Sequence, residues 1–302
     1  MSILDRPPVA RFLAAHARPG AGPPPLAVFD CDGTVIRGDI GEAMFYRQIE
    51  RFQFRRSPAD VWTEHPERER LGGLFGTLAP LDDAARRAHG AFDEFAGMLL
   101  DWYFDGIAAG RVAGACADIV RLLAGHTVEE VRAIARATFA EELASPFGTR
   151  RLGNRDLPRG VRYLGESVAL LRALAARGFD VWAVSGSNVW SVEPVFARLG
   201  VPPGRVIGIA LAEAAGVLTD TVVQPVPIRE GKVGALRART AAVPLLVASD
   251  SKNDIPLFLS SQGLKVRVNS RNRDTDDFFR AAGTAPDGSW VNVDAPQTID
   301  QV

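Results

Sequence analysis

Cysteine, lysine and histidine are all scarce in this chain of 302 residues. The two cysteines, Cys31 and Cys116, are too few for a disulfide framework and fit a reducing compartment. The four histidines are scattered at spacings that suit no zinc site. Only three of the 35 basic residues are lysine, so the positions at which the chain uses lysine are informative.

Long apolar runs and a strong charge of one sign are also missing. No stretch approaches the ~18 uncharged apolar residues that a membrane span needs, and residues 1–7 lack the pattern of a secretory leader. A net charge of −1 gives no electrostatic footprint for nucleic acid or an anionic membrane. We therefore expect a cytoplasmic protein whose partner is a small molecule. The length exceeds the ~100–200 residues of a typical domain, which predicts a core and a second module.

The most informative segment is an apolar strand that ends in two carboxylates. Residues 26–29 read Leu-Ala-Val-Phe and are followed by Asp30, Cys31, Asp32 and Gly33. Residues i and i+2 of a strand project to the same face, so the two aspartates can point at one place. Carboxylates so close repel each other unless a divalent cation neutralises one and the shared site raises the pKa of the other. This pattern favours phosphoryl transfer, although aspartate and glycine are also ordinary turn residues.

Later segments end in a similar way. An apolar run over 181–184 stops at Ser185, and another over 245–248 stops just before Asp250. Between them Lys232 opens a helical pattern. Open parallel sheets build their sites in the crevice beyond the carboxyl ends of the strands, so we expect these side chains to meet there. Taken singly, Ser185 and Lys232 would instead be interpreted as a helix N-cap and a surface cation.

The order of these motifs resembles that of the haloacid dehalogenase superfamily of phosphohydrolases, and within it the phosphoserine phosphatase-like branch. The resemblance implies an α/β fold: a Rossmann-like parallel sheet with helices on both faces, plus an inserted α-helical cap. We place the core at 1–38 and 157–302 and the cap at 39–156. Ser249 departs from the family, which usually has glycine there. The interval between the first two motifs is also longer than a compact cap requires, which leaves the substrate open. The residues that carry the resemblance are Asp30, Asp32, Gly33, Thr34, Ser185, Gly186, Lys232, Asp250, Asn253 and Asp254.

Local patterns agree with this division. The cap region is mostly helical in pattern, and Thr127 with Glu130 forms a capping box that opens a helix. Strand and helix patterns alternate after residue 158, with a hairpin around 214–216 assigned to the core. The segment from Ser185 to Ser187 is expected to be a turn at a helix N-terminus, and the tail from residue 284 is weakly patterned.

The resemblance also implies roles. Asp30 is the expected nucleophile that forms an aspartyl-phosphate, and Asp32 the acid and base for the leaving group and water. Ser185, Gly186 and Lys232 are expected to bind the phosphate, where a compact ammonium can touch both phosphate and carboxylate. Mg²⁺ is the expected cofactor, held by Asp30, Asp250 and the main-chain carbonyl of Asp32. The expected supporting residues are Thr34, Asn253 and Asp254.

Alternative interpretations use the same residues. Cys31 and Arg37 have the Cys-x5-Arg spacing of cysteine phosphatases, but Asp32 would place a negative charge beside the thiolate. Phosphotransfer to an alcohol acceptor would use the same motifs as hydrolysis. A catalytically silent binding protein on this fold is disfavoured, because it would be expected to lack a catalytic carboxylate. The sequence therefore predicts a phosphatase for a small soluble phosphate ester.

Substrate choice is expected to lie in the cap. Asp39 and Glu42 follow the first motif, where related phosphatases place an acid against the substrate's amino group, although both also suit a helix N-terminus. They predict an aminated ester such as phosphoserine, with phosphocholine or another amino-alcohol phosphate as the alternative. Four aromatic residues could add cation–π contacts or simply pack in the cap core: Trp62, Trp102, Tyr103 and Phe104.

Overall fold

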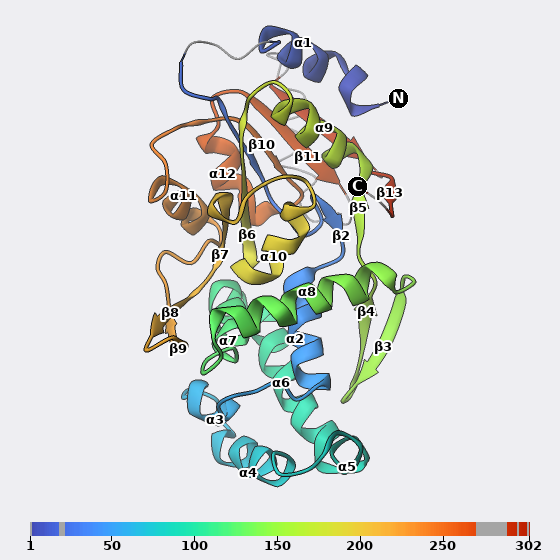
Figure 1. The fold of residues 1–302 in the computed structure, drawn as a ribbon, viewed down its shortest axis with the longest axis vertical. Coiled ribbons are helices and arrows are strands. Elements are labelled where there is room, and N and C mark those ends of the chain that lie inside the picture. The colour runs from blue at the N-terminus through green and yellow to red at the C-terminus, as the bar shows by residue number, and fades with distance from the viewer. Residues whose placement is uncertain (1, 18–21, 270–288, 295, 301) are drawn as a thin grey trace. The chain divides into compact units, whose positions relative to one another are not determined.

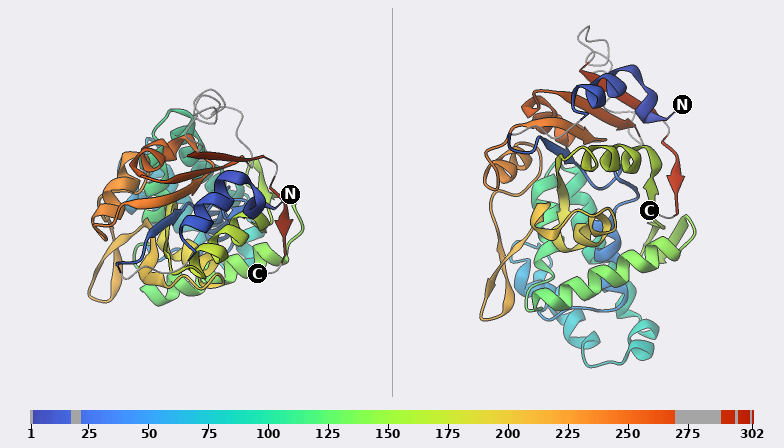
Figure 2. Two further views of the ribbon diagram at one scale, coloured as in Figure 1. Left: turned by 90° about the horizontal axis from the view of Figure 1, so that it is seen from above. Right: turned by 45° about the horizontal axis from the view of Figure 1, so that its top comes forward.

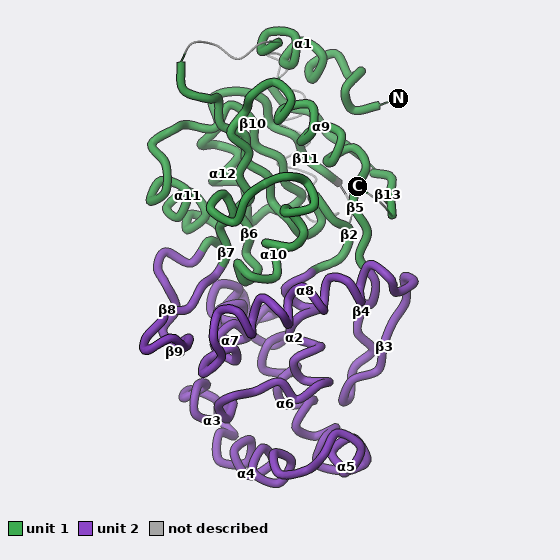
Figure 3. The backbone as a smooth tube through the Cα atoms, viewed as in Figure 1, with its two compact units in different colours: residues 1–39, 161–208, 227–302 green, residues 40–160, 209–226 purple. Residues whose placement is uncertain are grey.

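The computed structural model describes residues 2–17, 22–269, 289–294, 296–300 and 302. The chain forms two compact units (Figure 3). The core unit comprises residues 1–39, 161–208 and 227–302, and the inserted unit comprises residues 40–160 and 209–226. The segment 209–226 contains the hairpin that the sequence had assigned to the core, so this part of the expected division was wrong.

Six strands form the main sheet of the core unit in the order β12-β11-β10-β1-β6-β7 (Figure 1). The pairings from β12 through β6 are parallel. These pairings confirm the predicted parallel α/β core. The strands are β1 (Leu26–Phe29), β6 (Asp180–Asn188), β7 (Val206–Ile209), β10 (Pro244–Ser249), β11 (Leu264–Asn269) and β12 (Trp290–Asp294).

Helices cover both faces of this sheet, as the sequence predicted (Figures 1 and 2). All four residues of β1 are buried, which is typical of a central parallel strand. Leu26 and Val28 project to one face and pack with residues of α11 (Glu230–Arg237) and α12 (Ile255–Ser260). The other main helices of the unit are α1 (Pro7–Ala15), α9 (Gly165–Ala175) and α10 (Val189–Ala197).

The core unit also has a small antiparallel sheet that the sequence did not reveal. It has the order β13-β5-β2. Strands of two or three residues are too short to show an alternating pattern. Strand β12 was likewise hidden in the weakly patterned tail, of which 284–288 lie outside the described residues. The strands of the small sheet are β2 (Ile36–Arg37), β5 (Arg162–Leu164) and β13 (Thr298–Ile299).

The inserted unit is mainly helical. Helix α8 (Val128–Ala144) begins with the predicted capping box: Thr127 Oγ1 accepts from Glu130 N at 3.1 Å, and Glu130 Oε2 accepts from Thr127 N at 2.8 Å. Among the described residues no helix is long and apolar enough to cross a bilayer. The remaining helices of the unit are α2 (Ile40–Glu50), α3 (Pro58–Val61), α4 (Arg68–Leu78), α5 (Asp83–Ala88), α6 (Ala91–Ala108) and α7 (Val112–Arg121).

Two hairpins complete the inserted unit. Strands β3 (Gly148–Leu152) and β4 (Arg155–Arg159) form a hairpin where a mostly helical pattern was expected up to about residue 156, so the end of that helical region was wrong. Strands β8 (Leu211–Ala214) and β9 (Val217–Val222) form the predicted hairpin. Backbone hydrogen bonds from Gly125 N to Leu218 O (2.7 Å) and from Leu218 N to His126 O (2.8 Å) explain why it belongs with the inserted unit.

Candidate active site

The loop after β1 brings the first two aspartates to the end of the sheet. Asp30 N donates to Ala248 O at 2.9 Å, which keeps Asp30 beside β10. Gly33 then adopts a φ of +75°, which side-chain-bearing residues rarely tolerate. A Cβ on Gly33 would lie 2.2 Å from Asp250 Oδ2. Glycine is therefore required here, both for the turn and for the close approach of the Asp250 carboxyl group.

A buried lysine joins two carboxylates at the centre of the site. Lys232 Nζ lies 2.8 Å from Asp30 Oδ1 and 2.6 Å from Asp254 Oδ1. All three residues are buried, with Asp254 fully inaccessible. Thr34 Oγ1 lies 3.3 Å from both Asp30 Oδ2 and Asp250 Oδ1, so it bridges the carboxylates that end β1 and follow β10.

The pKa values reflect this crowding. Burial raises the pKa of Asp250 well above its ordinary value, and the nearby charges of Asp30 and Asp254 raise it further. Burial also raises the pKa of Asp254 to about 6, against the opposing effect of Lys232. For Lys232, burial lowers the pKa, but Asp254 and Asp30 outweigh it and the net shift is upward. The lysine is therefore cationic, and the cluster holds more carboxyl groups than it has cations.

The segment from Ser185 to Ser187 lies within a strand. The turn at a helix N-terminus that the sequence predicted for it was therefore wrong. Strand β6 continues to Asn188, and α10 begins only at Val189, with Asn188 Oδ1 accepting from Ser191 N at 2.8 Å. The backbone around Ser185 is therefore not the N-terminus of a helix, and the helix cap is Asn188.

The hydroxyl groups of Ser185 and Ser187 both face the second aspartate. Ser187 Oγ donates to Asp32 Oδ2 at 2.7 Å, and Ser185 Oγ lies 3.4 Å from the same oxygen. Ser187 N also donates to Ser185 Oγ at 3.1 Å. Sequence reasoning missed the contact of Ser187, although the alternation of a strand would place residues 185 and 187 on one face.

The segment 249–254, at the end of β10 and just after it, holds the buried carboxylates in place. Ser249, which replaces the family's usual glycine, donates its hydroxyl to Asp254 Oδ2, and thus fixes the carboxylate that pairs with Lys232. Asn253 Oδ1 accepts from Arg229 Nε at 3.3 Å. Neither the Ser249 nor the Arg229 contact was predicted, since both depend on side chains from separated segments meeting at the sheet edge.

The residues predicted to hold Mg²⁺ fit that ion. The carboxyl groups of Asp30 and Asp250 both contact the Thr34 hydroxyl, and their oxygens are the hard ligands that Mg²⁺ prefers. Because Gly33 has no Cβ, there is room for the carboxyl group of Asp250 beside it. Burial, followed by the charges of Asp30 and Asp254, raises the pKa of Asp250, and a bound cation would favour its ionised form. Among the described residues no cluster of three or more His, Cys, Asp or Glu side chains is arranged to hold a metal, so main-chain oxygen, phosphate or water would complete a ligand set.

The burial of Cys31 argues against the alternative in which its thiolate is the nucleophile of a cysteine phosphatase. Cys31 is fully buried, and burial, followed by the charges of Asp32 and Asp30, raises the pKa of its thiol well above the ordinary value. A nucleophilic cysteine needs the opposite shift. Arg37 is exposed and lies in the small sheet opposite Arg162. The Cys-x5-Arg spacing is therefore not a phosphate loop in this fold.

The predicted substrate acids lie at the start of α2. Asp39 is half-buried and directly precedes the helix. Glu42, in its first turn, accepts hydrogen bonds from Tyr46 (2.7 Å) and Tyr103 (3.0 Å). The two tyrosine hydroxyls thereby fix the orientation of the Glu42 carboxyl group.

The four aromatic residues of the cap pack within it. Trp62 is buried and donates to Asp118 O at 2.7 Å, while Trp102 donates to Asp118 Oδ2 at 2.9 Å. Arg111 lies 4.8 Å from the Trp102 ring centroid and Arg155 lies 4.7 Å from that of Phe104. These two rings therefore contact cations of the chain itself, and Tyr103 binds Glu42.

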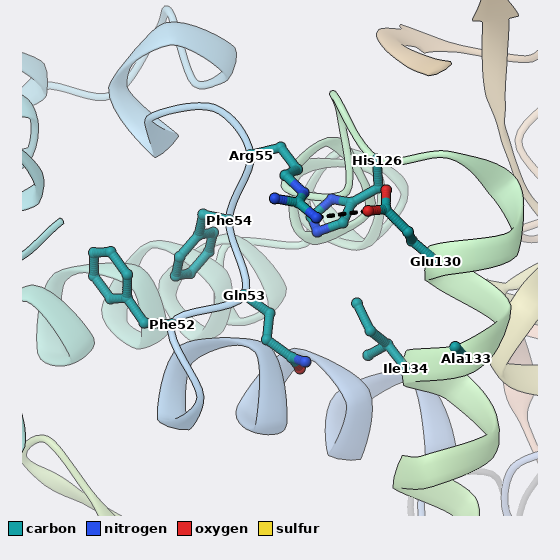
Figure 4. A pocket seen from close by; sticks show the side chains of 8 residues that line it. All are labelled: Phe52, Gln53, Phe54, Arg55, His126, Glu130, Ala133 and Ile134. Atoms are coloured by element: carbon teal, nitrogen blue, oxygen red, sulfur yellow. Dashed lines mark hydrogen bonds and ion pairs between the residues drawn. The ribbon is translucent and has the colours of Figure 1, made fainter. Parts of the chain in front are cut away.

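A hollow of about 360 Å³ lies in the inserted unit and is lined by two stretches of the chain, within residues 52–55 and 126–134 (Figure 4). Arg55 and Glu130 form an ion pair of 2.5 Å across one side of it. His126 Nδ1 contacts Leu123 O at 3.1 Å, and burial lowers the pKa of this histidine. The hollow has no carboxylate pair or nucleophile like those at the edge of the main sheet. Its lining residues are Phe52, Gln53, Phe54, Arg55, His126, Glu130, Ala133 and Ile134.

Comparison with known proteins agrees with this geometry. The model of the haloacid dehalogenase-like hydrolase family matches residues 27–259 of the chain. This chain therefore belongs to the haloacid dehalogenase-like hydrolases. The matched range contains every proposed catalytic, phosphate-binding and metal-binding residue. No curated protein matches the chain in sequence.

Two solved structures have a similar fold. A conserved functionally unknown protein from Anaerococcus prevotii is 19% identical with a TM-score of 0.74, covering 93% of this chain and 89% of that chain. A protein of unknown function from Bordetella pertussis is 18% identical with a TM-score of 0.57, and the match covers 90% of this chain and 99% of that chain. A phosphoserine phosphatase in apo form is 15% identical with a TM-score of only 0.41, covering 85% and 98%.

Proposed function

We propose that the chain is a Mg²⁺-dependent phosphatase that hydrolyses a small phosphate monoester through an aspartyl-phosphate. The observation that carries this proposal is the centre in which Lys232 binds Asp30 at 2.8 Å while Thr34 bridges Asp30 and Asp250. A buried carboxylate held beside a buried ammonium, at the open end of a parallel sheet, is suited to attack a phosphate. Membership of a hydrolase family supports the reaction class.

The first half-reaction uses two aspartates. A carboxylate oxygen of Asp30 forms a bond to phosphorus as the bond from phosphorus to the ester oxygen breaks. Asp32 donates its proton to the departing oxygen, so the alcohol leaves neutral. Lys232 and the Ser185 segment stabilise the negative charge on the phosphoryl oxygens, and each well-placed donor of this kind is commonly worth ~3–4 kcal/mol.

The second half-reaction restores the enzyme. Asp32, now ionised, takes a proton from a water molecule whose oxygen attacks phosphorus. The bond from phosphorus to Asp30 breaks, and inorganic phosphate leaves with Asp30 again ionised and Asp32 again protonated. Asp30, Asp250 and the main-chain carbonyl of Asp32 would hold Mg²⁺, which when bound offsets the negative charge shared by phosphate and carboxylates.

The proposed substrate is a phosphate ester that carries an ammonium group, as phosphoserine does. Asp39 and Glu42 support this choice, because they follow the nucleophile closely and Glu42 is oriented by two hydroxyl donors. A cytoplasmic location would fit such a soluble metabolite.

The test is a phosphate-release screen. Purified protein is incubated with a panel of phosphate esters, including phosphoserine and phosphocholine, with Mg²⁺, with EDTA, and with Mg²⁺ added back after EDTA. We expect turnover that chelation abolishes and Mg²⁺ restores. Activity that chelation leaves untouched, or no turnover of any ester, would contradict the proposal. Product analysis with added alcohol acceptors separates hydrolysis from phosphotransfer.

A further inference from the structure

We propose that Ser187 is a positioning residue that fixes the orientation of the acid and base Asp32; this inference rests on the proposed function. Ser187 Oγ donates a hydrogen bond to Asp32 Oδ2 at 2.7 Å, whereas Ser185 Oγ lies 3.4 Å from the same oxygen. Both serines lie on β6, whose parallel pairing with β1 reaches Phe29 just before the catalytic loop.

The geometry assigns the two oxygens of Asp32 different tasks. A hydroxyl proton that points at Oδ2 makes this oxygen an acceptor, so the proton that Asp32 donates belongs on the other oxygen. Free rotation of the carboxyl group would exchange the two oxygens. Anchoring Oδ2 to Ser187 prevents this exchange, because Ser187 is held in turn by a strand of the main sheet and by its own N–H bond to Ser185 Oγ at 3.1 Å.

Ser187 is therefore separate from phosphate binding. Ser185 is expected to face the phosphate oxygens, and Lys232 to neutralise their charge. A residue that acts only through Asp32 has a distinct kinetic signature, because general acid catalysis matters for a basic leaving group and little for one that departs without a proton.

The experiment compares two substrates of the same ring shape, phenyl phosphate and p-nitrophenyl phosphate, with Mg²⁺. For Ser187→Ala we expect kcat/KM for phenyl phosphate to fall about tenfold or more, since positioned acids contribute about 10²–10⁴-fold, and kcat/KM for p-nitrophenyl phosphate to fall less than about threefold. The comparison uses kcat/KM because this ratio reports the formation of the aspartyl-phosphate, whereas kcat also depends on its hydrolysis, in which Asp32 acts as the base for both esters. Ser187→Thr keeps the hydroxyl and should restore most of the lost rate.

A double-mutant cycle gives a second readout. Once Asp32→Asn has removed the acid, adding Ser187→Ala should cause no further loss on phenyl phosphate, because the two residues act as one unit. Ser57→Ala is the control, since Ser57 Oγ only accepts from Ala59 N (3.3 Å) at the start of α3; it should affect both esters equally.

The outcomes separate the two proposals. A wild-type protein that releases phosphate from neither ester overturns the proposed function, and this inference with it. If the wild-type protein turns over both esters, the phosphatase proposal stands. The role of Ser187 is overturned if the kcat/KM of Ser187→Ala is unchanged, is lowered equally for both esters, or shows a loss additive with that of Asp32→Asn.

Discussion

At the scale of single residues, one lysine organises the centre of the site. Lys232 is one of three lysines in the chain, is 4% exposed, and pairs with both Asp30 and Asp254. Removing one partner of a buried ion pair typically costs about 3–5 kcal/mol, because the other charge stays buried without compensation. Replacing such groups by apolar ones is often neutral or stabilising, so the triad is better explained by chemistry than by stability.

Asp30→Asn should abolish turnover while leaving the fold intact. The amide has nearly the same shape as the carboxylate but cannot attack phosphorus as an anion. We expect phosphate release to fall by at least about 10³-fold in a variant that still folds, because Lys232 keeps its ion pair with Asp254 at 2.6 Å. Asp101→Asn is the matched control, because Asp101 pairs with Arg155 (2.7 Å) in the inserted unit. If the Asp30→Asn variant kept activity near that of the wild type, the proposed mechanism would be wrong.

Cys31→Ser should keep most of its activity. The thiol is fully buried, and its raised pKa makes it a poor nucleophile. A serine hydroxyl at this apolar position should lower the free energy of unfolding by about 1–3 kcal/mol. Steady-state kinetics and denaturant unfolding of the same sample measure both effects. Complete loss of activity in a folded variant would favour the thiolate enzyme instead.

At the scale of elements, strand β6 and helix α2 carry the polar side chains on which two of the proposals rest. Because β6 remains a strand to Asn188, Ser185 and Ser187 project to the same side, where a helix would have turned them apart. In α2, residues four apart share a face, which explains why Tyr46 reaches Glu42.

Asp39→Asn and Glu42→Gln should selectively impair an aminated substrate. We expect kcat/KM for phosphoserine to fall about tenfold or more, equivalent to ~1.4 kcal/mol of transition-state binding, and kcat/KM for p-nitrophenyl phosphate to stay near wild type. Glu50→Gln is a control on the same helix, where Glu50 lies 3.5 Å from Arg150. If both substrates lose activity in equal proportion, the acids serve the fold or the shared chemistry, and the amine proposal fails.

At the scale of the whole molecule, the carboxyl cluster links stability to pH. The pKa of Asp254 is about 6 in the folded protein against an ordinary 3.8, and that of Asp250 is also raised. At pH values between 3.8 and about 6, Asp254 therefore binds a proton more often in the folded state than in the unfolded state. The contribution of these groups is therefore fully present below about pH 4 and is lost as pH rises through about 6.

Mg²⁺ should stabilise the protein more at about pH 7.5 than at about pH 5, because protons compete with the ion for the same carboxyl groups. Thermal unfolding with EDTA and with Mg²⁺ at the two pH values measures the difference. Asp250→Asn should lose most of the Mg²⁺-dependent shift, while Asp101→Asn should keep it. A shift that is equal at both pH values, or that survives in Asp250→Asn, would contradict this linkage.

Local sequence determined much of the core and of the helical cap. The apolar run before Asp30 had to be a buried strand, the pattern of alternating strands and helices required a parallel sheet, and Thr127 with Glu130 marked the start of α8. The motifs of the candidate site were also readable, because their polar side chains follow apolar strand patterns or stand in the first turn of a helix. The turn expected at Ser185 is instead part of β6. These features depend on neighbours in the sequence, so a pattern a few residues long reveals them.

Tertiary structure decided what depends on residues far apart in the chain. The bond from Ser187 to Asp32 joins two motifs whose side chains meet only after β6 pairs with β1, and Ser249 reaches Asp254 through the turn that follows β10. Strand β12 and the three short strands of the small sheet exist because a neighbour supplies their hydrogen bonds. The β8–β9 hairpin belongs to the inserted unit because Leu218 pairs with the Gly125–His126 segment. Such contacts are set by packing and by long-range pairing, and these leave no periodic trace in the local sequence.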